Sequence, residues 1–372
     1  MIPINLPNIG EEEIKAVVSV MRKGPLTSAM GMGPQVTQFE KNYAEFAKAK
    51  YAIAVNSGTA ALHATLLALG LDKDSEVILP SFTFVATAEA VVLSGAKPVF
   101  VDIDPLTCNI STVEIEKAIN KKTKVILPVD LYGLSAQMKT IQKIARDHNL
   151  YVVEDAAQAH GASHLNRSPG TFADAACWSL YASKNMTTGE GGVVTTNNDE
   201  LAEKLRMIRT HGEKAKYASQ MLGHNYRMSE IQAAIGIIQL KKLAGFLKKR
   251  RSNAERLSQK LIKTDRIILP KETAADLHSW YLYTVRLVHG NELKRDKLRA
   301  ELHEKGIGAE SYYLNPVHTM PFYRENFGDF DLPQTIKASK QVLSLPVHPS
   351  VTMDQIDFIG ETVVQLISNK SV

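Results

Sequence analysis

Between residues 50 and 200, short apolar runs alternate with helix-like segments, and this alternation strongly constrains the possible folds. Strands joined through helices at this spacing need right-handed crossover connections, which produce a mostly parallel sheet with helices on both faces. Ligands of such sheets bind beyond the carboxyl ends of the strands. The sequence therefore predicts an α/β fold with a site at that edge, and the expected strands are 51–55, 76–79, 97–101, 124–129 and 150–153.

The pattern changes near residue 225. A long helix is expected from Ser229 to about Arg251, followed by strands in WYLYTVRLV and SLPVH and by helices near 296–305 and 353–367. This change predicts a large domain over residues 1–244 and a smaller C-terminal α/β domain over 245–372. The basic run at 248–251 is expected on the solvated face of the long helix.

Composition narrows the class of protein. The chain of 372 residues is 44% apolar, which suffices for a sizeable buried core. It has no uncharged apolar run of about 18 residues and no signal-peptide pattern, so we expect a cytoplasmic protein without a membrane segment. Cys108 and Cys177 are expected to be reduced packing residues. The net charge of +5 comes without a nucleic-acid-binding motif and suits a small anionic substrate.

Small, hydroxyl and aromatic residues follow the first two predicted strands. Ser57, Gly58 and Thr59 open a helix after YAIAV, where exposed amides, hydroxyls and the helix dipole favour a phosphate. Plain capping of the helix is the alternative for these residues. Phe84 follows the second strand, where it could stack on a planar ring or pack in the core. These strand ends therefore suit a phosphorylated aromatic ligand.

Three further polar residues add chemistry to this edge of the sheet. Asp155 comes just after the apolar run at 150–153, at the ligand edge of the sheet, and could hold a proton on a pyridine nitrogen or cap the next turn. Gln158 could donate a hydrogen bond to a ring oxygen. Lys184 lies between an apolar run and GEGG, where partial withdrawal from water makes an amine able to form a Schiff base with an aldehyde. With the Ser179 hydroxyl near the phosphate, this set suits pyridoxal phosphate.

Several segments are similar, in order along the chain, to the DegT/DnrJ/EryC1/StrS family of sugar aminotransferases. One such segment would be weak support, whereas the ordered set covers most of the chain and is specific. The segments are NSGTAALHATLLALG, PSFTFVATAEAV, AKPVFVDID, VVEDAAQAHGA, SKNMTTGEGG, NYRMSEIQAAIG and LSLPVHPSVT.

The resemblance implies an aspartate aminotransferase-like fold of type I, the cofactor pyridoxal 5′-phosphate and ping-pong transamination. It makes Lys184 the Schiff-base lysine and general acid/base, and Asp155 the partner of the pyridine nitrogen. Gln158 would face the ring hydroxyl, and Phe84 would stack on the ring. The residues implied to hold the phosphate are Ser57, Gly58, Thr59 and Ser179.

The resemblance also implies the partners of the reaction. Asn225 matches a residue that reaches the phosphate of the neighbouring subunit, which implies a homodimer with composite active sites. The amino donor is expected to be L-glutamate and the acceptor a nucleotide-linked keto-sugar, in the biosynthesis of an amino sugar for polysaccharide. The segment ESYYLNPVHTMPFY resembles one that lines the sugar site, so Tyr313 and His318 are candidates for substrate binding. The overall match favours C4 of a 4-keto-6-deoxy hexose, as in perosamine synthases.

The sequence also leaves other substrates and activities open. C3 keto-sugars and cyclitol ketones are alternative acceptors. A sugar dehydratase of the same superfamily is disfavoured because the resemblance places a histidine where this chain has Lys184. A decarboxylase, a cysteine desulfurase and a regulator find no support in the other motifs. Asp102 and Asp104 are expected to close a strand rather than bind metal, His63 and His160 to be structural, and residues 189–192 to form a turn.

Overall fold

The computed structural model describes residues 1–368, and its centre is a seven-stranded sheet. Each strand except β8 runs in the same direction, because β8 pairs antiparallel with both of its neighbours while the other strand pairs are parallel. The predicted mostly parallel sheet is therefore confirmed. In spatial order, the strands are β1 (Tyr51–Val55), β8 (Gly192–Thr196), β7 (Ala175–Ser179), β5 (Tyr151–Asp155), β4 (Thr123–Ile126), β2 (Glu76–Pro80) and β3 (Lys97–Val101).

The strands are apolar on both faces because helices cover both sides of the sheet. Successive residues of β1 enter different cores, since Ile53 packs into one cluster and Ala52 and Ala54 into another. One face is covered by α3 (Gly58–Ala68), α4 (Ala86–Leu93) and α7 (Asp199–Arg209), whose buried residues share a single cluster. The other face is covered by α2 (Pro34–Ala47), α5 (Thr112–Ala118), α6 (Met138–Asp147) and the first part of α8 (Glu230–Leu261).

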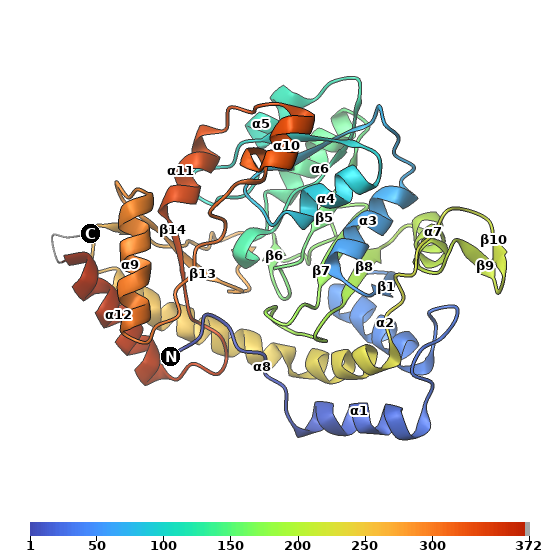
Figure 1. Cartoon of the computed structure of the whole chain (residues 1–372), viewed down its shortest axis with the longest axis horizontal. Helices are drawn as coiled ribbons and strands as arrows, with labels where there is room; N and C mark the ends of the chain where they lie inside the picture. Colours follow the sequence, from blue (N-terminus) through green and yellow to red (C-terminus); the bar gives the residue numbers. More distant parts are fainter. Residues whose placement is uncertain (369–372) are drawn as a thin grey trace.

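A smaller core lies at the other end of α8. Its three-stranded sheet consists of β11 (Ile267–Ile268), β13 (Tyr283–Leu287) and β14 (Val342–Leu345), which pack with α9 (Glu292–Glu304) and α12 (Met353–Ser368). Figure 1 shows α8 running along the molecule from α2 to α12. The remaining α-helices and strands are α1 (Glu11–Lys23), α10 (Pro321–Phe327), α11 (Pro333–Gln341), β6 (Ser163–His164), β9 (Glu213–Ala215), β10 (Ala218–Ser219) and β12 (Asp276–Leu277).

Helix α8 is longer than the sequence pattern predicts. Its N-terminus is as expected, because Ser229 and Gln232 form a reciprocal capping box. It continues to Leu261 because Ala254, Leu257 and Leu261 bury a second apolar stripe in the smaller core. The division at residues 244 and 245 falls inside this one helix and stays a prediction.

The basic run on α8 differs from the sequence-based expectation. Lys248 is exposed, but Arg250 is only 2% exposed and donates hydrogen bonds to main-chain carbonyls. The expectation of a fully solvated face is therefore wrong at Arg250, because the helix turns this residue between the two cores. Both cysteines are buried and unpaired, as predicted. Over residues 1–368, none of the helices is long and apolar enough to cross a membrane.

Candidate active site

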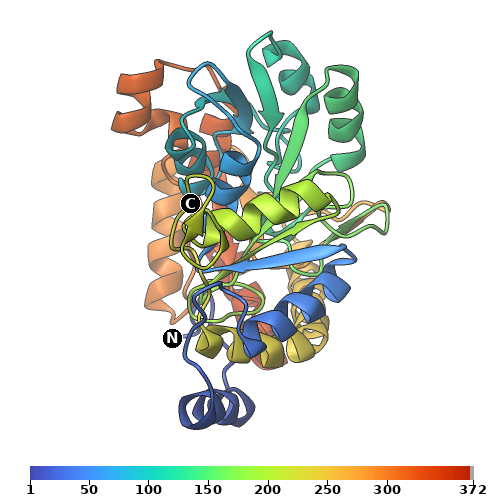
Figure 2. The same cartoon turned by 90° about the vertical axis from the view of Figure 1, so that its right-hand side faces the viewer.

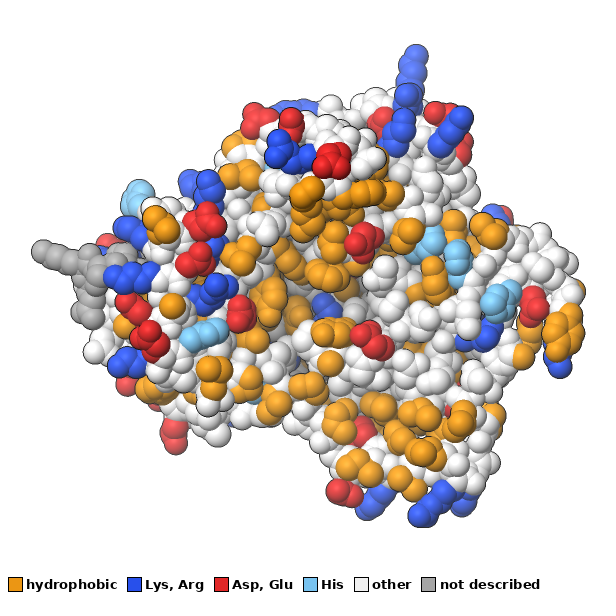
Figure 3. All heavy atoms as spheres, viewed as in Figure 1, with side chains coloured by type: hydrophobic (Ala, Val, Ile, Leu, Met, Phe, Trp, Pro, Cys, Tyr) orange, Lys and Arg blue, Asp and Glu red, His pale blue; other side chains and the backbone are white. Residues whose placement is uncertain are grey.

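A cavity of about 630 Å³ lies at the carboxyl ends of the central strands. Figure 3 shows apolar side chains around a hollow near the centre of the face seen in Figure 1. Parallel strands bring their ends together here, so residues far apart in the sequence meet. Those predicted site residues that line the cavity are Ser57, Gly58, Thr59, Phe84, Asp155, Gln158, Ser179, Lys184 and Tyr313.

Asp155 ends β5 with its carboxylate held from two sides. Its Oδ2 accepts a hydrogen bond of 2.8 Å from the hydroxyl of Thr87, and its Oδ1 accepts one of 3.1 Å from the amide of Ala157. Burial raises the pKa of Asp155, while the hydrogen bonds from Thr87 and Ala157 and the charge of Lys184 oppose that rise. The carboxylate is thus buried but supported, and it faces a cavity that also contains an amine.

Lys184 lies in the connection between β7 and β8 and is half-buried. Its Nζ lies 4.6 Å from the centre of the Tyr281 ring, a cation–π contact that leaves the amine on the cavity side. The hydroxyls of Ser183 and Tyr281 are 3.0 Å apart, so the residue before Lys184 contacts the same tyrosine. The lysine is therefore positioned by its neighbours rather than extended into solvent.

The N-terminus of α3 forms a compact cradle against β7. The Ser57 hydroxyl accepts a hydrogen bond of 3.0 Å from the amide of Ala60, and the amides of Gly58 and Thr59 are the first of the helix, which have no partner within it. A Cβ added to Gly58 would lie 2.8 Å from the Cβ of Ser179. Free amides, hydroxyls and a helix N-terminus fit the chemistry of a phosphate.

Gln158 and two aromatic rings form another part of the cavity wall. The Gln158 Oε1 accepts a hydrogen bond of 2.7 Å from the amide of Tyr132, and its Nε2 donates one of 3.1 Å to the hydroxyl of Tyr313. Phe84 is 57% exposed, and its ring centre lies 6.2 Å from that of Tyr313. Phe84 is therefore available to a ligand instead of packing in the core.

Two predicted site residues lie outside the lining of this cavity in the described structure. Asn225 is exposed, and its carbonyl accepts a hydrogen bond of 3.2 Å from the side chain of Asn56. His318 is buried, and its Nδ1 lies 2.6 Å from the hydroxyl of Ser81. Asn225 would need a second chain to meet a cofactor, and the ring of His318 is held by Ser81, so their predicted roles stay predictions.

The residues set aside in the sequence have structural partners. The carboxylate of Asp102 accepts hydrogen bonds from the amides of Gln334 and Thr335 and so caps α11. His63 bonds the Tyr226 hydroxyl at 2.7 Å, and His160 packs against Trp178. Among residues 1–368, no cluster of three or more acidic, histidine or cysteine residues could hold a metal ion.

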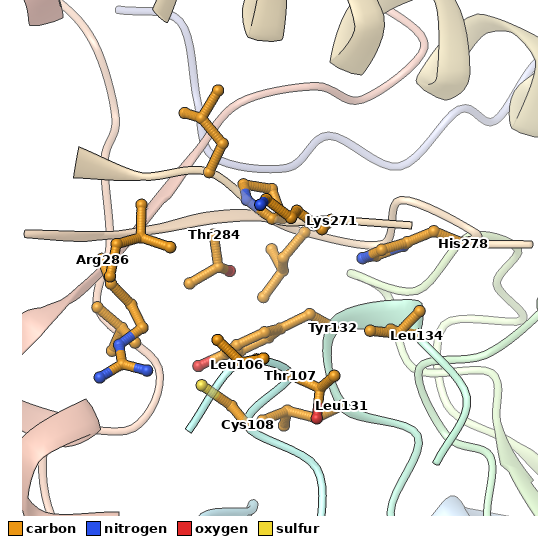
Figure 4. Close-up of a pocket in the computed structure, with 15 residues that line it drawn as sticks. Leu106, Thr107, Cys108, Leu131, Tyr132, Leu134, Lys271, His278, Thr284 and Arg286 are labelled. Atoms are coloured by element: carbon orange, nitrogen blue, oxygen red, sulfur yellow. The ribbon is translucent and has the colours of Figure 1, made fainter. Parts of the chain in front are cut away.

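A second cavity, of about 40 Å³, lies between the segments that follow β3 and β4 and the three-stranded sheet (Figure 4). Its lining includes Tyr132, His278, Thr284 and Arg286. The Arg286 Nη2 donates a hydrogen bond of 2.8 Å to the side chain of Gln341. This cavity contains none of the predicted site residues and is too small for a cofactor.

Sequence reasoning missed Thr87, Ser183, Tyr281 and Tyr312, which also line the large cavity. The hydroxyl of Thr87, in the first turn of α4, lies 2.9 Å from that of Thr83 in the loop before this helix, and no helix periodicity indicates the contact. Tyr281 and Tyr312 come from the C-terminal part of the chain, where no local pattern indicates which residues return to the sheet. Only the tertiary arrangement reveals them.

Comparison with known proteins places this chain in a family. The family model described as the DegT/DnrJ/EryC1/StrS aminotransferase family matches residues 7–364. A GDP-perosamine synthase from Caulobacter vibrioides is 39% identical over 339 residues, which cover 90% of this chain and 91% of that protein.

Solved structures agree with this match. DesV from S. venezuelae, solved with a ketimine intermediate, superposes with a TM-score of 0.90 at 36% identity and covers 95% of this chain and 94% of its own. Spr1654 from Streptococcus pneumoniae, solved in a PLP form, has a TM-score of 0.94 at 26% identity, with 100% of both chains covered. These matches confirm the predicted fold type and the aminotransferase class. The chain belongs to the DegT/DnrJ/EryC1/StrS aminotransferase family.

Proposed function

We propose that the protein transfers the amino group of L-glutamate to a nucleotide-linked keto-sugar, at C4 of a 4-keto-6-deoxy hexose. The observation that carries this proposal is the convergence of Lys184 and Asp155 on one cavity whose other walls suit a phosphate and an aromatic ring. The similarity to a GDP-perosamine synthase supports the choice of C4. Cyclitols and C3 keto-sugars are the competing acceptors.

The cofactor of this aminotransferase family is pyridoxal phosphate, and the donor set of the cavity fits it. We assign the phosphate to Ser57, Gly58, Thr59 and Ser179, the ring nitrogen to Asp155, the ring hydroxyl to Gln158 and the ring face to Phe84. The Gln158 amide already shares its Nε2 with Tyr313. When bound, the cofactor supplies an aldehyde that receives the amino group and a ring that accepts electrons from the reacting carbon.

The side chains of this protein then have distinct tasks. The amine of Lys184 would hold the aldehyde before substrate arrives and afterwards move a proton at the reacting carbon. The carboxylate of Asp155 would hold a proton on the ring nitrogen, and Thr87 would keep that carboxylate in place. Tyr312 and Tyr313 line the cavity and would exclude water and contact the sugar.

We further propose that the protein acts as a homodimer in the cytoplasm, with Asn225 completing the phosphate site of the second copy. Large apolar side chains are exposed around α1, which lies at the edge of the molecule in both views (Figures 1 and 2). They are Leu6, Ile9, Ile14, Met21, Leu26 and Met32. Exposed apolar surface of this extent favours a protein partner, and two unpaired cysteines suit a reducing compartment.

The test combines trapping and turnover. Protein loaded with pyridoxal phosphate is reduced with borohydride and digested, and we expect the label on Lys184 alone; label elsewhere in Lys184→Ala, with retained turnover, would sink the assignment. The loaded enzyme is then assayed with glutamate against GDP-, dTDP- and UDP-linked 3-keto and 4-keto sugars. Product NMR locates the new amine, and amination of C3 alone would replace the C4 proposal without touching the role of Lys184.

A further inference from the structure

Arg250 is a buried cation without an acidic partner within residues 1–368. It is 2% exposed, and its Nη1 donates hydrogen bonds to the carbonyls of Trp280, at 3.2 Å, and Tyr281, at 3.1 Å. Its Nη2 donates one of 3.3 Å to the side-chain oxygen of Asn5. Burial lowers the pKa of Arg250 to about 10, so the guanidinium remains charged at neutral pH. Burial of a charge without an acidic partner destabilises the folded protein, and a hydrophobic residue at this position would be less destabilising.

Two hydrogen-bonding partners of Arg250, Asn5 and Tyr281, contact Lys184 or the residue before it. The side-chain amide of Asn5 donates a hydrogen bond to the carbonyl of Ser183, the residue before the lysine. The ring of Tyr281 lies under the lysine amine, and its hydroxyl contacts Ser183. Arg250 and Lys184 also line one small cavity together. One guanidinium thus connects the main chain of Tyr281 with the peptide that carries Lys184.

The planar fork of arginine suits this task better than an ammonium. Nη1 reaches two successive carbonyls while Nη2 points to a third oxygen on a different segment, an arrangement that a single lysine amine cannot reproduce. Because α8 is anchored in both cores, Arg250 approaches these segments from a rigid support.

We propose that Arg250 is a positioning residue, which acts through Tyr281 and Asn5 to fix the amine of Lys184 in the active site. The inference rests on the proposed role of Lys184. It goes beyond that role because it assigns part of the reactivity of the lysine to a residue on α8 and to the N-terminal segment.

The experiment compares Arg250→Lys, Arg250→Gln and Asn5→Ala with Arg256→Gln. Arg256 lies six residues further along the same helix and forms a two-pronged ion pair with Asp357 of α12, and neither residue lines the cavities around Lys184. Its loss therefore controls for removal of an arginine from α8. Asn5→Ala leaves the buried charge in place and tests the link to Ser183 even if the Arg250 variants fold poorly.

Two measurements separate positioning from stability. In cofactor-free protein, acetic anhydride labelling followed by mass spectrometry gives the rate at which Lys184 reacts at each pH, with exposed Lys248 as an internal reference. In loaded protein, the single-turnover reaction with glutamate gives its maximal rate and half-saturation separately. We expect Arg250→Gln and Asn5→Ala to change the labelling rate of Lys184 at least 5-fold and to lower the maximal rate at least 10-fold, with Arg250→Lys intermediate.

The results expected from Arg256→Gln are wild-type labelling and wild-type single-turnover rates. If folded Asn5→Ala and Arg250→Lys match wild type in labelling, pH profile and maximal rate, Arg250 is only a stabilising residue and the inference is overturned. Failure of wild-type protein to take up pyridoxal phosphate on Lys184 would instead overturn the proposed function. The two failures are therefore distinguishable.

Discussion

At the scale of single residues, the site depends on the hydrogen bonds that oppose protonation of the buried Asp155. Burial alone favours the neutral acid, which could not hold a proton on a ring nitrogen as an ion pair. The hydroxyl of Thr87 opposes this by donating to Oδ2, and the hydroxyl of Thr83 lies 2.9 Å from that of Thr87. The polar threonines are as buried as the carboxylate, so their hydrogen bonds have little competition from water.

Replacing Thr87 by valine should weaken cofactor binding. The change keeps the shape but removes a hydrogen bond to a charged group, worth about 1.5 to 3 kcal/mol, or about a factor of 10 or more in affinity. It should also raise the pKa of Asp155 further, so uptake of pyridoxal phosphate would move to higher pH. Absorbance titrations of cofactor-free protein from pH 5 to 9 measure both effects. Thr87→Ser should behave as wild type; equal losses in both variants would contradict this role.

Gly58 offers a test of the phosphate cradle. An alanine Cβ there would lie 2.8 Å from the Cβ of Ser179, so the helix N-terminus or β7 must move. We expect Gly58→Ala to weaken binding of pyridoxal phosphate more than binding of pyridoxal, which lacks the phosphate. Gly245→Ala, which adds a Cβ in open space on α8, should instead stabilise the protein by about 0.5 to 1 kcal/mol. Equal weakening of both ligands by Gly58→Ala would argue against a phosphate at this position.

At the scale of secondary-structure elements, the sequence predicts those features that follow from the periodicity of apolar residues. The meeting of Asp155, at the end of β5, with Ser57, which follows β1, was predictable because parallel strands share one edge of the sheet. The extension of α8 to Leu261 was not, because its second apolar stripe has meaning only once the smaller core exists. The prediction that Arg250 is solvated was wrong for the same reason. A basic run indicates a solvated helix face, and only the three-dimensional structure shows that this helix lies between two cores.

Two buried carboxyl groups lie side by side, that of Asp130 in the turn after β4 and that of Glu154 on β5. Asp130 and Glu154 are within hydrogen-bonding reach of each other, and neither Asp130 Oδ2 nor Glu154 Oε1 has another partner in the described structure. Burial raises the pKa of Asp130 from its ordinary value of 3.8 to about 7 and raises the pKa of Glu154 well above its ordinary value of 4.5. The pair must therefore share a proton to remain stable next to Asp155.

This pair predicts that stability falls as pH rises from about 4 to above 7. In that range the folded protein holds a proton that the unfolded chain has released, so the free energy of unfolding decreases with each step in pH. Urea unfolding of cofactor-free protein between pH 5 and 8 measures the slope. Glu154→Gln, whose amide can donate to Asp130, should flatten it. Asp199→Asn on the surface should leave it unchanged, and a wild-type slope in Glu154→Gln would refute the shared proton.

At the scale of the whole molecule, segments far apart in the chain build the cavity, and Asn225 lies outside its lining. The central sheet supplies Asp155, the N-terminus of α3 supplies the cradle, and the C-terminal part of the chain supplies Tyr281 and Tyr313, which pack in an apolar cluster separate from the smaller core. Exposed Tyr217 lies in the turn of the β9–β10 hairpin, and exposed Leu222 precedes Asn225 by three residues. Periodicity could not place Asn225 in the site of a second chain, because it reports only on the chain that carries it; that expectation rests on the family resemblance alone. The proposed dimer is therefore the step that most needs its own test.

Mixing two inactive variants tests whether sites are shared between copies. If Asn225 of one copy completes the site built around Lys184 of the other, Lys184→Ala and Asn225→Ala should each lose activity as pure proteins. After unfolding and refolding together, random pairing makes about half of the dimers mixed, each with one intact site, so about a quarter of wild-type activity should return. Co-refolding Lys184→Ala with Asp155→Asn, which lie in the same site, should restore none. Sedimentation of the mixture reports the dimer itself, and a dimer in which no activity returns would place Asn225 outside the partner's site.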